Sequence, residues 1–283
     1  MGDVLAGFHA AWEFESDSVL IRYERGIRTP KLFQALGERR IPLAALEDVT
    51  LTPGRRGKVV LRAVPRPGAD PLIEAAAGQL KEAYDPYRLV LPAGRETLAE
   101  YYADELRGRL TGSGPVDRHL VAAPSGPLQF KAYDGKAFFD GTSVRFQWFW
   151  TGASTAKWKA GDQIFPVADL NGVEWHSPEV LEGHLRLVTR HSATEPPAPP
   201  DQDPAAVVFG LGYGPVHESL PFAAAVLAAV RERRPGAAVS SAAGRRDPAD
   251  IAERIRHLGE LHQAGLVTDE EFSSKKAELL AEL

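Results

Sequence analysis

Apolar and polar residues alternate over short segments that occur in the same order in two parts of the chain. Residues 41–49 (IPLAALEDV) match residues 165–173 (FPVADLNGV). Two further pairs align on either side of this block, 16–21 with 141–146 and 57–62 with 183–188. Alternation between turn residues predicts strands. The chain therefore contains two copies of one domain.

Both copies end in a strand, at residues 87–91 and 206–209, followed by a turn and a helix. Thr97 and Glu100 have the spacing of a capping box, and Ser219 before Leu220 and Pro221 predicts the start of the second helix. Several strands followed by one helix, within roughly 100 residues, predict an α+β domain in which a helix plugs a curled antiparallel sheet.

The copies differ most in one insert. In copy one, residues 66–71 (RPGADP) lead into a helix that we predict over Leu72 to Ala83. In copy two, the corresponding residues 195–201 read EPPAPPD. Such a density of proline predicts a mobile loop without regular structure.

The C-terminal part follows a different pattern. Residues 234–248 are rich in small residues and lack an apolar period, which predicts a flexible linker. Beyond them, helical spacing, a glycine stop at Gly265 and a capping box at Thr268 and Glu271 predict two short helices. Helices this short cannot bury their apolar faces on each other alone, so we expect docking or self-association. The residues expected to mediate it are Ile255, Leu258, Leu261, Leu266, Phe272, Leu279 and Leu280.

Two parts of the chain resemble known protein families. Residues 255–272 (IRHLGELHQAGLVTDEEF), followed by Lys275, Lys276, Leu279 and Leu280, resemble the SHOCT (short C-terminal) domain. That resemblance implies a helical hairpin that assists oligomerisation or placement. The repeats resemble an actinobacterial domain-of-unknown-function family with a pleckstrin-homology-like (PH-like) fold. The match is carried by the Asp140-Gly141 turn, residues 41–43 and 165–167, and the strands at Gly57 and Gly183, with Ser16 replacing the turn glycine in copy one.

This resemblance implies no catalytic residues. The expected organisation is a PH-like copy one at 1–112, a PH-like copy two at 126–234, a flexible linker at 235–248 and a SHOCT hairpin at 249–283.

Composition and residue spacing argue against several classes of function. The chain has no cysteine, which excludes disulfides and thiolate chemistry and predicts a reducing, cytoplasmic setting. No apolar run reaches the roughly 18 residues of a membrane span. A net charge of −5 argues against general nucleic-acid binding. The histidines lack metal-ligand spacing, and Pro215 replaces the third glycine of a dinucleotide loop after residues 210–214 (GLGYG). We expect no metal, cofactor or catalytic site.

Comparison of the copies indicates one candidate surface. Residues 146–150 (FQWFW) align with 21–25 (IRYER), and alternation places Phe146 and Trp148 in the core. Phe149 and Trp150 instead replace charged residues, and Trp158 is close in sequence. These rings either pack on copy one or face an external partner.

Two basic runs provide an alternative surface for lipid headgroups or phosphate. They comprise Arg22, Arg25, Arg28 and Lys31, and Arg55, Arg56 and Lys58. Runs of this size are often only solvated surface. The sequence as a whole favours a non-catalytic adaptor or scaffold that binds protein partners. The alternative is a peripheral membrane-lipid or small-ligand binding protein, whereas an enzyme would need a cleft built from both copies.

Overall fold

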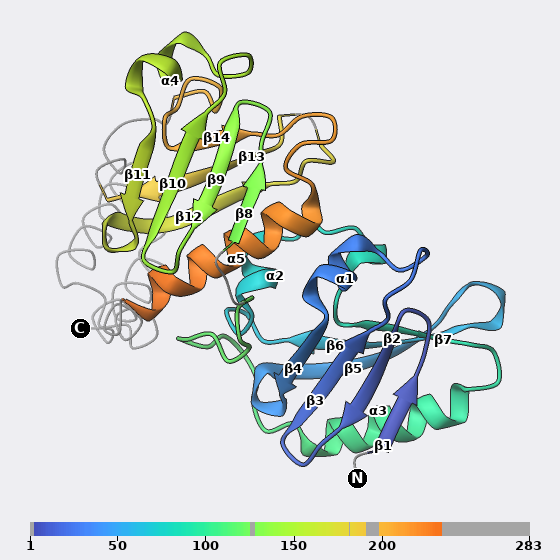
Figure 1. Cartoon of the computed structure of the whole chain (residues 1–283). Coiled ribbons are helices and arrows are strands. Elements are labelled where there is room, and N and C mark those ends of the chain that lie inside the picture. Colours follow the sequence, from blue (N-terminus) through green and yellow to red (C-terminus); the bar gives the residue numbers. More distant parts are fainter. Residues whose placement is uncertain (1–2, 125–127, 181, 191–197, 234–283) are drawn as a thin grey trace, which may run out of the picture. The chain divides into compact units, whose positions relative to one another are not determined.

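The computed structural model describes residues 3–124, 128–180, 182–190 and 198–233, and these fall within one compact unit, Met1–Arg234. The predicted linker at 235–248, the predicted hairpin at 249–283 and residues 195–197 of the proline-rich insert lie outside the described residues. The described residues form a mixed α+β structure of antiparallel sheets and helices, as predicted (Figure 1).

Copy one has a four-stranded sheet in the order β1-β2-β3-β4 and a three-stranded sheet in the order β5-β6-β7. Helix α3 follows the last strand, and two short helices, α1 and α2, interrupt the strands. The strands are β1 (Asp3–Ala6), β2 (Ala10–Phe14), β3 (Ser18–Tyr23), β4 (Glu38–Pro42), β5 (Leu46–Pro53), β6 (Val59–Pro65) and β7 (Arg88–Leu91). The helices are α1 (Lys31–Leu36), α2 (Pro71–Ala76) and α3 (Glu96–Arg109), with 3-10 turns at Leu43–Ala45, Arg55–Gly57 and Glu82–Tyr84.

Copy two repeats this arrangement, with sheets in the orders β11-β10-β9-β8 and β12-β13-β14 and with α5 after the last strand. The strands are β8 (Leu128–Lys131), β9 (Gly135–Phe139), β10 (Ser143–Trp148), β11 (Gln163–Pro166), β12 (Leu170–His176), β13 (His184–Thr189) and β14 (Ala206–Val208). The helices are α4 (Thr155–Ala160) and α5 (Val216–Glu232), with a 3-10 turn at Val167–Asp169.

Alternation along the strands sets which residues enter each core. In β2, Ala10, Trp12 and Phe14 are buried and the residues between them are partly exposed. Helix α3 covers this core and stacks Tyr102 on Phe14, with 4.4 Å between the ring centroids. Phe146 and Trp148 are buried in copy two, so their predicted core positions are confirmed. In each copy, the apolar faces of the sheets thus form a core that the helix after the last strand covers.

Three helix boundaries differ from the sequence predictions. The helix predicted over Leu72 to Ala83 ends at Ala76, because Ala77 adopts a left-handed conformation with φ 46°. Helix α3 begins at Glu96 after Arg95, without a side-chain cap, so the predicted capping box of Thr97 and Glu100 is not the start of the helix. Local spacing alone could not reveal these ends.

The third difference concerns α5, which begins at Val216 and carries Pro221 inside it. Ser219 is therefore not its first residue. The Ser219 hydroxyl lies in the interior, donates to the carbonyl of Gly214 at 2.9 Å and accepts from the indole of Trp175 at 3.0 Å. Tertiary contacts at Ser219 thus tie the first turns of α5 to β12.

No helix within the described ranges is long and apolar enough to cross a bilayer.

A buried ion pair anchors the insert of copy one. Arg39 of β4 contacts both carboxylate oxygens of Asp70 at 2.8 and 2.9 Å, and the Tyr87 hydroxyl donates to Asp70 at 2.7 Å. Asp70 also accepts from the backbone of Leu72 at 2.9 Å, so it caps α2. Burial raises the pKa of Tyr87, which therefore stays protonated and remains a donor. This network fixes α2 on copy one.

The other face of α2 joins copy one to copy two. Leu72, Ala75 and Ala76 are buried in the core cluster of copy two, and α2 lies against α5 (Figure 1). The Gln79 side chain then pairs with a strand of copy two: its amide donates to the carbonyl of Trp175, and its oxygen accepts from the backbone of Ser177, both at 2.9 Å. The two copies therefore share a core.

We predict that Leu72→Ala destabilises the protein by about 3 kcal/mol, because it leaves a cavity where α2 meets α5. Urea denaturation followed by tryptophan fluorescence measures this loss. Leu211→Ala is the matched control, since Leu211 is fully exposed and its truncation should change stability by less than about 0.5 kcal/mol. Equal effects of the two substitutions would contradict the shared core.

Candidate functional site

Two tryptophans form an exposed aromatic pair on copy two. Trp150 lies two residues after β10 and is 79% exposed, and Trp158 lies in α4 and is 50% exposed. Their rings meet edge to face, with centroids 5.7 Å apart and an interplanar angle of 90°. The described residues of copy one thus leave most of Trp150 uncovered. Phe149, the third residue proposed from the sequence, is only partly exposed.

A buried ion pair holds the segment that presents this pair. Lys157, next to Trp158, is fully buried and donates to Asp134 at 2.5 Å and to the carbonyl of Ala206 at 2.8 Å. Burial in a medium of low dielectric lowers the pKa of Lys157, and the attraction of Asp134 opposes this shift. The contacts fix α4 on the strands beneath it. The aromatic pair therefore sits on a rigid base.

The loop between β10 and α4 is held equally closely. The backbone of Phe149 donates to the carbonyl of Asp134 at 2.9 Å. Gly152 lies so close to the backbone of Tyr133 that a side chain there would collide with it. The Ser154 hydroxyl accepts from the backbone of Lys157 at 3.4 Å and caps α4. A rigid loop presents its apolar rings at little entropic cost to a partner.

The basic residues divide into two groups. Arg28 lies beside Phe8 in a shallow depression, and the ammonium of Lys58 lies 4.2 Å from the centre of the Phe8 ring. Ile27, beside Arg28, is fully exposed. The structure thus brings the loop between β3 and α1, which carries Arg25 and Arg28, close to the turn between β5 and β6, which carries Arg55, Arg56 and Lys58.

The other two basic residues, Arg22 and Lys31, have different surroundings. Arg22 is on β3, where it contacts Glu13 and lies 3.8 Å from Glu38. Its charge is therefore compensated. Lys31 begins α1 and lines a separate pocket. Sequence proximity had grouped both with Arg25 and Arg28, but their contacts separate them. Ile27 and Phe8 were not selected from the sequence, although an isoleucine between two arginines was a usable signal.

The histidines of the described ranges form no group of three or more potential metal ligands with one another or with acidic residues. His176 and His184 stack across β12 and β13, with centroids 4.3 Å apart. Burial lowers the pKa of His184, so this ring is neutral at neutral pH. Residues 210–214 form the corner between β14 and α5 that the sequence predicts.

The hydrophobic residues proposed for the tail lie outside the described residues, so their predicted role stays a prediction. They are Ile255, Leu258, Leu261, Leu266, Phe272, Leu279 and Leu280.

Comparison with known sequences identifies two families. The Domain of unknown function DUF4429 matches residues 12–107 and again residues 137–227, and the Short C-terminal domain matches residues 253–280. No curated protein matches the chain. The predicted duplication and C-terminal domain are thus confirmed. Because the two DUF4429 matches span more than half of the chain, this protein belongs to the DUF4429 family, with the domain present twice and followed by a Short C-terminal domain.

Proposed function

We propose that this protein is a non-catalytic adaptor that binds protein partners through copy two and self-associates or docks through its C-terminal domain. Within the mixed α+β class, we assign each copy to the PH-like fold. A four-stranded sheet, a three-stranded sheet and a helix after the last strand support this assignment in both copies. The absence of cysteine supports a cytoplasmic setting.

The exposed pair of Trp150 and Trp158 is the observation that carries the proposal. A tryptophan side chain buries about 150–250 Å² when a partner covers it, and tryptophans are enriched among the residues that dominate binding energy. Two such rings on a rigid base thus provide a compact anchor for a protein partner.

The buried charges support a role without catalysis. Asp70 is engaged by Arg39 and Tyr87, and Asp134 by Lys157, and all of these groups fix elements to one another. Catalytic acids and bases must reach a substrate, whereas these groups are enclosed by protein. The shifted pKa values of Tyr87, Asp134 and Lys157 therefore reflect packing.

A second candidate function is binding to an anionic lipid surface through copy one. Ile27 is fully exposed between Arg25 and Arg28, and Phe8 is exposed beside Lys58. Apolar side chains surrounded by cations can enter the interface while the cations meet lipid headgroups. This arrangement favours a peripheral contact.

We predict that the full chain is an oligomer and that a chain ending at Arg234 is a monomer, since the tail carries the apolar face that needs a partner. Light scattering coupled to size exclusion measures both masses. A full-length Leu258→Glu variant provides a control that keeps the length of the chain. If the truncated chain keeps the mass of an oligomer, the tail does not drive assembly.

We predict that Trp150→Arg weakens partner binding by about tenfold or more, because it removes roughly 2 kcal/mol of contact energy. Its stability should change by less than about 0.5 kcal/mol, since the ring is exposed. Quantitative affinity purification compares the partners retained by the wild type, by this variant and by Tyr101→Arg. Tyr101 is a control aromatic residue, 58% exposed on α3. Retention of the same partners by all three proteins would refute the aromatic anchor.

For lipid binding, Ile27→Asp should weaken sedimentation with anionic vesicles by about tenfold, because it removes the apolar contact and adds a repulsive charge. Leu211→Asp, at an equally exposed residue of copy two, should have little effect. Binding should also fall as the salt concentration rises, since salt screens the attraction between the basic side chains and the anionic headgroups. Lack of sedimentation at low salt would remove this candidate.

A further inference from the structure

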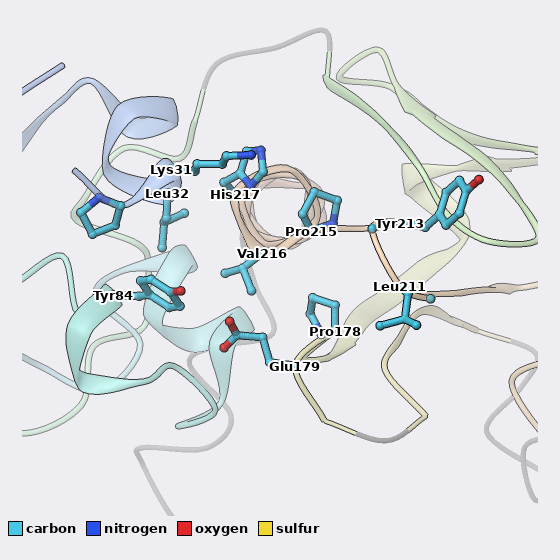
Figure 2. Close-up of a pocket in the computed structure, with 13 residues that line it drawn as sticks. Lys31, Leu32, Tyr84, Pro178, Glu179, Leu211, Tyr213, Pro215, Val216 and His217 are labelled. Carbon is cyan, nitrogen blue, oxygen red and sulfur yellow. The ribbon is translucent and has the colours of Figure 1, made fainter. Parts of the chain in front are cut away.

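A pocket of about 370 Å³ lies where the first turns of α1 and α5 meet. Copy one contributes Lys31, Leu32 and Tyr84, and copy two contributes the corner before α5 and the turn between β12 and β13. Figure 2 shows these side chains around a common space. Pockets of this size hold small organic ligands.

Most of the wall is apolar. Leu32 and Tyr84 face Val216 across the pocket, and Pro178 and Leu211 continue the apolar surface at the other end (Figure 2). Leu211 is fully exposed, although it lines the pocket. A ligand with an apolar body would cover it and would remove the leucine from water.

The charges of the pocket are unequal. Lys31 and His217 lie next to each other at one side, and Glu179 lies at the other (Figure 2). Glu179 is compensated by Lys81 at 3.1 Å, whereas Lys31 makes no ion pair with any described residue. Among the residues that line the pocket, the uncompensated charge is therefore that of Lys31.

His217 adds a hydrogen-bonding group beside that cation. Burial lowers the pKa of His217, the Glu218 carboxylate at 3.8 Å opposes this shift, and Lys31 lowers the pKa further. The ring is thus mainly neutral at neutral pH. The first turn of α5 contributes the partial positive charge of a helix N-terminus at the same side.

We propose that this pocket binds a small apolar carboxylate, whose head lies between Lys31 and His217 and whose hydrocarbon body lies along Leu32, Tyr84 and Val216. The unpaired ammonium compensates the charge of the head, and the apolar wall removes the body from water. Both copies contribute to the site, so such a ligand stabilises the junction where α2 and α1 pack on α5.

Calorimetric titration of the full chain with decanoate tests this proposal, and decanol is the uncharged probe of equal length. Decanoate should bind at least tenfold more tightly than decanol. Lys31→Met, which keeps most of the aliphatic stem, should remove this preference. Lys159→Met, at an exposed lysine of α4 outside the pocket, should keep it.

A second measurement reports on the position of the head. Nuclear magnetic resonance should show that decanoate raises the pKa of His217, because an anion stabilises the imidazolium, and that decanol does not. Leu211→Glu should weaken decanoate binding at least tenfold without unfolding the protein, because it places an exposed charge where the apolar body of the ligand would lie. Equal binding of both probes, an unchanged affinity in Lys31→Met, or no binding of decanoate would overturn the proposal.

Discussion

Burial of the apolar face of α2 against α5 is the contact on which the rest of the described structure depends. Leu72, Ala75 and Ala76 belong to the chain of copy one but to the core of copy two. Leu32 of α1 is buried in the same cluster. Two domains joined only by a linker would move independently, whereas a shared apolar core makes their relative motion costly. The inter-copy pocket exists because this core holds its walls together.

In each copy, a buried ion pair holds a short helix that lies between two strands. In copy one, Asp70 and Arg39 hold the start of α2, and in copy two, Asp134 and Lys157 hold α4. A lone charge at such a position would be strongly destabilising, and a pair that satisfies its hydrogen bonds is not. These contacts also specify geometry, because each carboxylate accepts backbone hydrogen bonds as well.

The two copies thus share a framework and differ in the segments that it carries. The loop before α1 presents an isoleucine between arginines, and the equivalent loop before α4 presents a tryptophan. The insert after β6 is a joining helix in copy one. Duplication therefore supplied two stable supports, and divergence of their loops gave each support a different surface chemistry.

The amino-acid sequence by itself determined the duplication, the main strands, the helix at the end of each copy and the match of the tail to the Short C-terminal domain. Alternation of apolar residues reports which face of a strand is buried, so the core positions of Phe146 and Trp148 could be predicted. The sequence also singled out Trp150, because a ring replaced a charge found in copy one.

Only the tertiary structure decided where α2 ends, which residues of copy one enter the core of copy two, and which basic residues lie beside the same aromatic ring. Leu72 and Ala76 are apolar at helical spacing, and this pattern does not reveal the partner they pack on. Arg28 and Lys58 both lie beside Phe8 although they are far apart in sequence. The apolar period of a segment indicates that a side chain is buried. Which residues it packs against depends on contacts between segments far apart in the sequence, and such contacts form the sites.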